Sequence, residues 1–337
     1  MVGHRVLLAG TALVALALGL LAQKGDDPVS TWAERLLDDG RPARLESLEG
    51  NDCIRCHTAI GEEWRESMHA LAWEDPHYRK ELKSIRRKKS CWGCHVPEPL
   101  DAQGWTQKPA PRADSRHLGI DCVACHLAAD GVTMLGPDGI ATDAHPTQQS
   151  KLFDHDADNT ICVTCHATTI GPVIGVAKDF VDTDQTMLGL SCVGCHMPAI
   201  ERAIANDDAG TEYPIRKGRS HRIMTPRDPL FLRKAFLFRV KVEDGRTVLS
   251  IENNCGHRVP GLLERKLHFR AKVLDESGKQ VAAGELTIDN RAYLPVEENL
   301  DLVVEGTGAT LELVGLHEAP GVERPVTFLE RTFTLGR

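Results

Sequence analysis

The sequence predicts two architectures in succession: short helices and irregular loops over residues 28–228, then an antiparallel β-sandwich over residues 232–337. Three observations support this division. Ten of the 11 cysteines lie in five Cys-x-x-Cys-His pentapeptides, all before residue 200. Aromatic residues make up only 5% of the chain, which is little for a conventional protein core. After Pro229 the cysteine pairs end, and apolar and polar residues begin to alternate with the period of a strand.

Each pentapeptide has the form of an attachment site for a c-type haem. Two cysteines three residues apart lie on one face of a helical turn, so both thiols can bond to one porphyrin edge. The histidine that follows is placed to bind the iron. The sequence therefore predicts five covalently bound haem c groups, attached through Cys53 and Cys56, Cys91 and Cys94, Cys122 and Cys125, Cys162 and Cys165, and Cys192 and Cys195, with His57, His95, His126, His166 and His196 as iron ligands.

Other uses of paired cysteines fit this pattern poorly. A zinc ribbon combines Cys-x-x-Cys pairs two at a time, whereas this chain has an odd number of pairs, each followed by histidine. A disulfide inside each pair would leave the five histidines unexplained. A thioredoxin-type motif would occur once, between a strand and a helix. The low aromatic content also agrees with haem, because porphyrins are themselves large apolar objects around which a chain can fold.

Histidines outside the motifs could bind the far side of each iron, and they are dense between the motifs. We predict five of them as distal ligands: His69, His117, His145, His221 and His257. His145 is preferred over His155, because the carboxylates around His155 suit a solvated loop. His77 and several methionines remain alternatives, since a thioether also binds haem iron and raises its potential. If one iron kept an open side, an unused His77 or His155 could act there as an acid or base.

Residues 232–337 show strand alternation interrupted by turns. Residues 236–242 and 247–251 flank Glu243-Asp244-Gly245 and predict a hairpin. Further strands are expected at 267–273, 280–288, 300–305, 309–315 and 325–335, about seven in all, which is typical of a sandwich. The Gly- and Pro-containing stretch Asn253–Gly261 predicts a shaped loop. His257 in that loop either reaches a haem of the first region or bonds to nearby backbone, and Cys255 is expected to be a buried free thiol.

The N-terminus and the charge bear on location and partners. Residues 1–22 combine a basic start with a short apolar run, which predicts a secretory signal or, as the alternative, an uncleaved membrane anchor. The protein is therefore expected to be periplasmic or extracellular. The net charge of −8 gives no indication of nucleic-acid binding. The basic run Arg79–Lys89 is interpreted as a solvated helix face, or alternatively as a docking patch for an acidic partner.

Several of these stretches resemble the multihaem c-type cytochromes grouped around hydroxylamine oxidoreductase, its tetrahaem electron acceptor and the octahaem reductases. The likeness is carried by four stretches: Trp64-x-x-Ser67-Met68-His69-Ala70, Cys91-Trp92-Gly93-Cys94-His95, His117-Leu118-Gly119-Ile120-Asp121-Cys122, and Cys192-Val193-Gly194-Cys195-His196-Met197-Pro198. It implies a multihaem cytochrome domain with short helices around stacked haems. It also implies mostly bis-histidine irons, with His69, His117 and His221 as distal ligands. Pentahaem nitrite reductases usually carry lysine in place of the motif histidine of the active haem, whereas every motif here ends in histidine.

The leading functional hypothesis is an electron carrier that exchanges electrons with a donor and an acceptor protein through closely spaced haems, with no catalytic residue of its own. Two alternatives remain. One is a reductase or oxidase of a small nitrogen or sulfur compound at a five-coordinate iron. The other is a subunit of a haem filament or membrane redox complex, with the strand-rich region as the interaction module and oligomerisation as the consequence.

Overall fold

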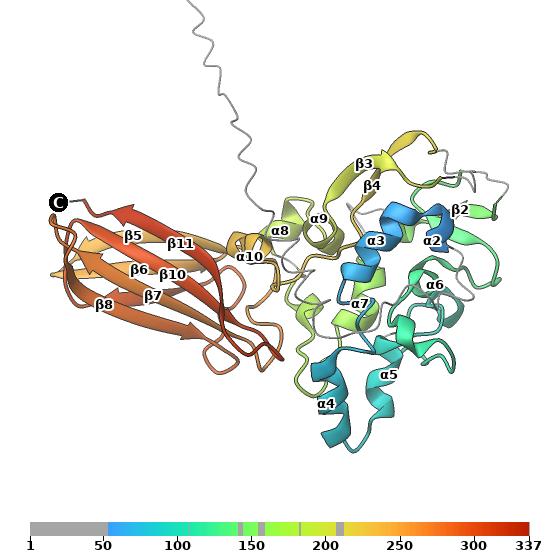
Figure 1. Cartoon of the computed structure of the whole chain (residues 1–337), viewed down its shortest axis with the longest axis horizontal. Coiled ribbons are helices and arrows are strands. Elements are labelled where there is room, and N and C mark those ends of the chain that lie inside the picture. Colours follow the sequence, from blue (N-terminus) through green and yellow to red (C-terminus); the bar gives the residue numbers. More distant parts are fainter. Residues whose placement is uncertain are drawn as a thin grey trace, which may run out of the picture. The chain divides into compact units, whose positions relative to one another are not determined.

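The motif-bearing region folds into short helices and turns joined by loops (Figure 1). The computed structural model describes residues 53–336 except for residues 107, 141–143, 154–158, 182 and 207–211. The predicted signal over residues 1–22 and the alternative ligand His155 lie outside the described residues. Among the residues that the structure describes, no helix is both long enough and apolar enough to cross a membrane.

Each pentapeptide forms one short helix or the end of one, as its spacing requires. The five motif helices are α2 (Cys53–Cys56), α5 (Lys89–His95), α6 (Cys122–His126), α7 (Thr160–His166) and α9 (Cys192–His196). Two of them begin with a side-chain cap: Asp121 accepts a hydrogen bond from the backbone of Ala124, and Ser191 accepts one from Gly194. Such caps satisfy backbone donors that a short helix leaves free, so these helices are stabilised locally.

The remaining elements of this region connect the motifs. The other helices are α3 (Thr58–Glu66), α4 (Pro76–Ser84), α8 (Asp184–Met187) and α10 (Pro229–Leu232), with 3-10 turns η2 (Asp101–Gln103), η3 (Arg116–Leu118), η4 (Lys151–Phe153), η5 (Val176–Lys178) and η6 (Arg233–Ala235). Two small sheets complete it: β1 (Met134–Gly136) pairs with β2 (Thr147–Gln149) in parallel, and β3 (Ala199–Ala203) pairs with β4 (Ile215–Arg219) antiparallel.

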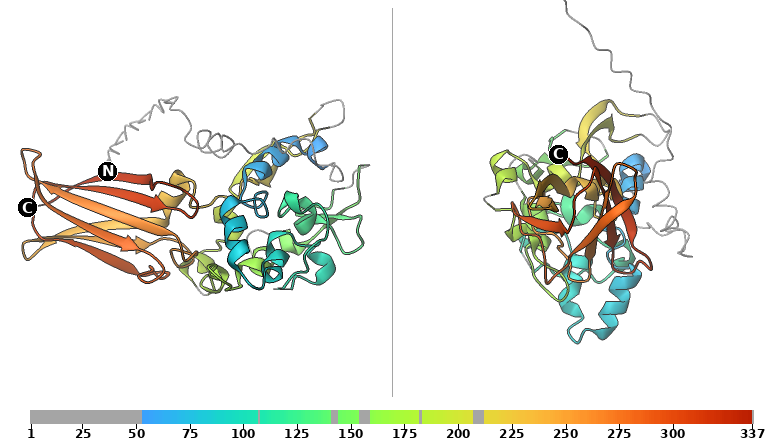
Figure 2. Two further views of the ribbon diagram at one scale, coloured as in Figure 1. Left: turned by 60° about the horizontal axis from the view of Figure 1, so that its bottom comes forward. Right: turned by 90° about the vertical axis from the view of Figure 1, so that its left-hand side faces the viewer.

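The C-terminal strands form two antiparallel sheets, which confirms the antiparallel strand pattern expected from the alternation. One sheet has the order β5-β6-β9 and the other β11-β10-β7-β8 (Figures 1 and 2). The strands are β5 (Phe236–Glu243), β6 (Arg246–Asn253), β7 (Lys266–Leu274), β8 (Gln280–Ile288), β9 (Asn299–Val304), β10 (Thr310–Glu318) and β11 (Val326–Thr334).

Both of these sheets contribute to a single hydrophobic core. Leu249 and Ile251 come from β6, while Phe269 and Leu313 come from β7 and β10, and all four side chains are at most 1% exposed. Phe236 extends the core and meets the ring of Phe269 edge-on, with 5.2 Å between ring centroids. The motif-bearing region has only small clusters of buried side chains, such as Ile54, Trp64, Ala70 and Leu118. Apolar packing between side chains is thus concentrated in the strands.

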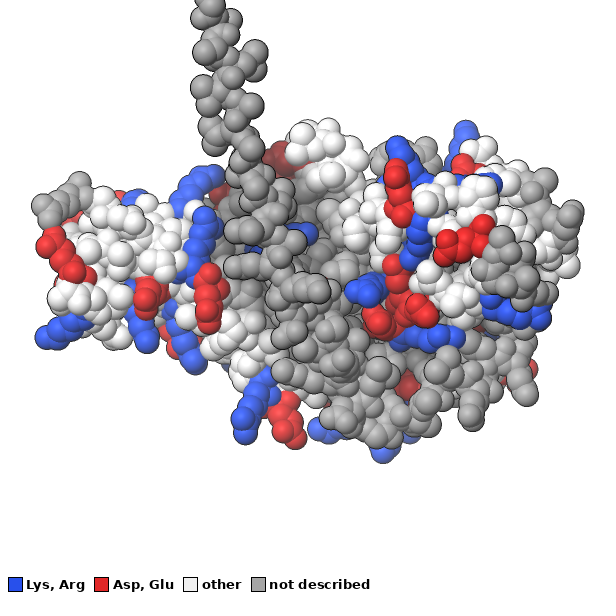
Figure 3. All heavy atoms as spheres, turned by 45° about the horizontal axis from the view of Figure 1, so that its top comes forward, with Lys and Arg blue, Asp and Glu red and all other residues white. Residues whose placement is uncertain are grey.

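The surface carries mixed charge. Figure 3 shows basic and acidic side chains interspersed over the described part of the face that it draws. The basic run Arg79–Lys89 extends from α4 into α5, and residues 86–89 in it are all exposed. This exposure agrees with the interpretation of the run as a solvated face.

Candidate functional site

Four of the five motif histidines lie opposite a second histidine from a distant part of the chain. The centroid-to-centroid distances between the rings are 6.3 Å for His57–His145, 6.2 Å for His69–His166, 6.2 Å for His126–His221 and 6.3 Å for His196–His257. The near-identity of these four distances indicates a common geometric cause.

That separation fits one metal ion held between two imidazoles. Metal–nitrogen bonds are about 2 Å long, and ring bonds of about 1.33 Å place each nitrogen about 1.1 Å from the centre of its ring. Two metal–nitrogen bonds and two distances from nitrogen to ring centre, placed in line, add up to about 6.2 Å between the ring centres. The four histidine pairs therefore have the spacing of the two axial ligands of a haem iron.

The imidazoles of most paired histidines are oriented through Nδ1. The Nδ1 atom of His57 lies 2.6 Å from the carbonyl oxygen of Ile204, and that of His126 lies 2.8 Å from the oxygen of Leu135. A carbonyl oxygen only accepts, so Nδ1 carries the hydrogen and Nε2 keeps its lone pair for a metal. The same contact recurs at His196 with Met224, at His221 with Arg219 and at His257 with Arg258.

Burial lowers the pKa of five of these imidazoles and so favours their neutral form. Desolvation, followed by the charge of neighbouring histidines, lowers the pKa of His69 to about 3. Desolvation is also the main reason why the pKa values of His196 and His221 are lowered to about 4. The pKa of His126 and that of His166 are lowered for the same reason. Because only the neutral ring has a free lone pair, burial favours the form that binds metal.

The second motif is different, because the ring next to His95 belongs to a tyrosine. The rings of His95 and Tyr78 are 3.8 Å apart between centroids, with planes 9° from parallel. Bonds from an imidazole to a metal lie in the plane of the ring, so a ring stacked on its face lies beside the ligand and not across the iron from it. Burial, ahead of the nearby Cys91, raises the pKa of the Tyr78 phenol. Its buried hydroxyl has no hydrogen-bond partner among the described residues.

An aromatic cluster surrounds this stacked pair. The ring of Trp73 meets Trp92 edge-on at 5.6 Å and lies 6.1 Å from Tyr78. The guanidinium of Arg116 lies 4.7 Å from the centre of the Trp92 ring, a cation–π contact. The surroundings of His95 are thus aromatic and rigid. Tyr78 was not predicted for this position from the sequence, although a tyrosine in a helix shortly before Cys91 was a usable signal.

Of the predicted distal ligands, His69, His145, His221 and His257 each lie in one of the four histidine pairs. His117 lies half-buried on η3. The pairs also join motifs that sequence distance does not suggest. His69 follows the first motif but lies opposite His166 of the fourth, and His221 follows the fifth but lies opposite His126 of the third.

Contacts between motif thiols show which motifs are neighbours. Three pairs of thiols lie close enough for one to shift the pKa of the other: Cys53 with Cys122, Cys94 with Cys165, and Cys162 with Cys192. The thiols of Cys125 and Cys165 interact electrostatically. The first motif thus lies beside the third, the third near the fourth, and the second and fifth both beside the fourth.

The loop between β6 and β7 brings His257 to the fifth motif. Arg258 makes two hydrogen bonds to the carboxylate of Asp179, of 2.6 and 2.7 Å. The Asn253 amide donates to the carbonyl of His257 at 2.9 Å. The thiol of Cys255 lies near Cys195, and burial raises its pKa to about 12. The loop is therefore fastened on both sides of His257.

Known proteins resemble this chain over the motif-bearing region. A family model described as cytochrome c554 and c-prime matches residues 52–127 and 139–197. Cytochrome c-554 of Nitrosomonas europaea is 31% identical over 86 residues, which are 22% of this chain and 35% of the relative. High-molecular-weight cytochrome c of Nitratidesulfovibrio vulgaris is 23% identical over 182 residues, which are 48% of this chain and 28% of the relative. The chain thus covers only about a third of these curated relatives.

One solved structure shares the fold over most of the chain. The crystal structure of a penta-haem cytochrome c552 from Thermochromatium tepidum superposes with a TM-score of 0.58 at 16% sequence identity. The similarity covers 84% of this chain and 97% of the other. At this identity the likeness concerns the fold.

Proposed function

We propose that this chain binds five haem c groups covalently and carries electrons between redox partners through them, as its similarity to multihaem c-type cytochromes supports. The observation that carries this proposal is the repeated 6.2–6.3 Å separation of four histidine pairs. Each pair has the spacing of two axial ligands on one iron. When bound, haem supplies an iron that takes up and releases one electron.

We assign the residues to the haems by motif. The cysteines of each Cys-x-x-Cys-His motif form the thioether links, and the motif histidine is the first axial ligand. The second ligands are His145 for the first motif, His221 for the third, His69 for the fourth and His257 for the fifth. Two imidazole ligands hold an iron at lower potential than an imidazole and a thioether, so a low-potential carrier is expected.

The neighbouring thiols support an order of electron transfer. Attachment sites whose cysteines lie close together bring their cofactors close together, and neighbouring cysteines lead from the first motif to the third and on to the fourth. The fourth motif then meets both the second and the fifth. We propose a branched path with the fourth haem at the branch point and the first, second and fifth haems at the ends.

Location and organisation belong to the same proposal. The protein is proposed to be exported to the periplasm or out of the cell, with anchoring through the N-terminus as an alternative. Covalent haem attachment and the signal-like residues 1–22 support this proposal. The partners are an electron donor and an electron acceptor protein. Residues 28–228 and 232–337 are proposed as two domains, with the strands supplying the loop that carries His257.

The test is a haem count combined with a spin-state count on the mature protein. A pyridine haemochrome assay should return five haems per chain, and electron paramagnetic resonance of the oxidised protein should show four low-spin irons of the bis-histidine type. A count well below five, or high-spin signals from most irons, would refute the proposal.

A second function is favoured by one specific observation: among the described residues, His95 is the motif histidine that lies in none of the four histidine pairs. The iron of the second motif is therefore the candidate site for reduction or oxidation of a small nitrogen or sulfur compound. Carbon monoxide added to the reduced protein should bind at one iron per chain. Reduced protein whose spectrum carbon monoxide leaves unchanged would eliminate this second function and leave electron transfer alone.

A further inference from the structure

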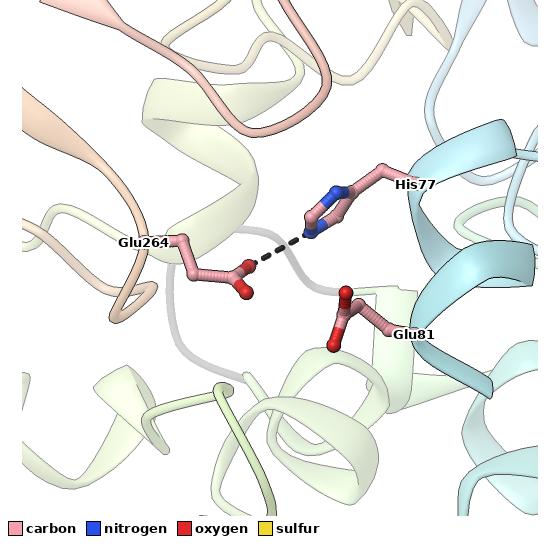
Figure 4. Close-up of side chains that lie close together, drawn as sticks. All are labelled: His77, Glu81 and Glu264. Atoms are coloured by element: carbon pink, nitrogen blue, oxygen red, sulfur yellow. Dashed lines mark hydrogen bonds and ion pairs between the residues drawn. The ribbon is translucent and has the colours of Figure 1, made fainter. Parts of the chain in front are cut away.

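Three side chains with metal-binding groups meet away from the histidine pairs (Figure 4). They are His77, Glu81 and Glu264, and one donor atom from each lies within 4.8 Å of the others. His77 and Glu81 are four residues apart on α4, so both project from the same helix face. Glu264 comes from the turn before β7. The cluster therefore joins two segments that are far apart in the sequence.

The backbone on both sides of this cluster is held by contacts of its own. Asp75 caps α4 by accepting a hydrogen bond of 2.8 Å from the backbone of Tyr78. Gly321, at φ +75°, packs against His77 so closely that a Cβ there would lie 3.1 Å from the His77 Cβ. The turn that carries Glu264 is fixed by a backbone hydrogen bond of 2.9 Å from Leu263 to Pro172. The backbone segments that carry His77 and Glu264 are thus held in place by contacts outside the cluster.

The charge of the cluster favours a cation. The Nε2 atom of His77 lies 2.8 Å from a carboxylate oxygen of Glu264, which is a hydrogen bond in the metal-free protein. Two carboxylates keep the cluster net negative even when the imidazole is protonated. The guanidinium of Arg79 on the same helix lies over the Trp73 ring, 5.0 Å from the centroid, in a cation–π contact. A divalent cation would neutralise both carboxylates at once.

The donor set selects the class of ion. One imidazole nitrogen and two carboxylate oxygens suit Zn²⁺ and related first-row transition metals, whereas Ca²⁺ and Mg²⁺ prefer oxygen ligands alone. Bonds of about 2.0–2.2 Å to one ion require the donor atoms to approach to roughly 3.5 Å, a small side-chain movement from the observed spacing. The side chains of His77 and Glu264 are 22% and 38% exposed, so an ion can enter and a water can complete its coordination.

We propose that His77, Glu81 and Glu264 bind one Zn²⁺ or similar divalent transition-metal ion, which ties α4 to the turn before β7. The residue after His77 is Tyr78, whose ring stacks on the motif histidine His95. The ion therefore stabilises the helix that packs against the second haem site, and its removal should leave that helix less rigid.

The experiment uses the fully haem-loaded protein after treatment with a chelator. Titration with Zn²⁺ in a calorimeter, with zinc counted by mass spectrometry, should give one equivalent per chain in addition to the haem iron. His77→Gln and Glu264→Gln should each weaken Zn²⁺ binding at least tenfold, the scale expected when a metal site loses part of its support. Ca²⁺ should bind more weakly than Zn²⁺.

His268→Gln is the matched control. His268 also lies between two glutamates, 3.5 Å from Glu285 and 3.3 Å from Glu318, but through different ring nitrogens. Lys266 in addition neutralises Glu318. This variant should bind Zn²⁺ as the wild type does. Absence of Zn²⁺ binding in the wild type, unchanged binding in His77→Gln and Glu264→Gln at normal haem absorbance, or tighter binding of Ca²⁺ would each overturn the proposal.

Discussion

The rings of His196 and His257 lie 6.3 Å apart between centroids, with their planes 19° from parallel. His196 closes the fifth motif, whereas His257 belongs to the loop between β6 and β7. The strand-rich part of the chain thus supplies one member of a histidine pair to the motif-bearing part. The proposed fifth haem site depends on both parts being folded.

Replacing His257 should affect one haem alone. In His257→Ala the fifth iron loses its second imidazole, so one low-spin signal should become high-spin and one additional carbon monoxide should bind per reduced chain. Paramagnetic resonance and carbon monoxide titration measure both changes. His268→Ala, which removes a histidine outside the four pairs, is the control. Equal spectra for His257→Ala and the wild type would rule out His257 as a ligand.

Tyr78 should tune the second haem site through its stacking on His95. Tyr78→Leu removes the aromatic contact and should lower the free energy of unfolding by about 1 kcal/mol, together with a shift in the potential of one haem. Tyr78→Phe keeps the ring and should resemble the wild type in both respects. Redox titration and thermal unfolding give the two readouts. A potential shift in Tyr78→Phe as large as in Tyr78→Leu would assign the effect to the hydroxyl and not to stacking.

The Asp179–Arg258 pair should make stability depend on pH in the acid range. Burial opposes ionisation of Asp179, but hydrogen bonds and charge from Arg258 outweigh it and lower the pKa of Asp179. Its contribution to stability is therefore present above the unfolded pKa of about 3.9 and is lost as the pH falls through the lower folded value.

Asp179→Asn should accordingly cost about 1 kcal/mol at pH 7, a modest amount because the pair is partly exposed. The difference from the wild type should shrink below a pH of about 4. Urea unfolding followed by circular dichroism at pH 7 and pH 3 measures this. Glu305→Gln, at an exposed position on the edge of the strand-rich region, serves as the control. A difference that grows on acidification would contradict the assigned direction.

The core of the two sheets should tolerate no cavity at Phe269. This side chain is fully buried and meets Phe236 and Phe328 edge-on, at 5.2 and 5.8 Å between centroids. Phe269→Ala should lower the free energy of unfolding by about 3–5 kcal/mol. Val281→Ala, at a position 50% exposed, should change it little. Chemical denaturation compares the two, and similar costs for both would argue against the core described above.

Much of this organisation could be predicted from local sequence. The Cys-x-x-Cys-His motifs can be recognised within one helical turn, because haem attachment needs these residues close together in the sequence. The strands β5–β11 follow from alternation with a period of two, which one buried face imposes. The histidine content between the motifs likewise predicted partners for the motif histidines, and four of these histidines lie opposite a second one.

Partnership between distant residues could not be predicted in this way. His69 lies opposite His166 and not near-neighbour His57, and Tyr78 stacks on His95 although no repeat or motif links them. Likewise Glu264 meets His77 across most of the chain. The sequence by itself therefore determined which cysteines and histidines are candidates for binding haem, and in which short helices or turns they lie. Which groups face one another emerged only from the packing of loops and helices, because such pairings depend on long-range contacts that no short stretch encodes.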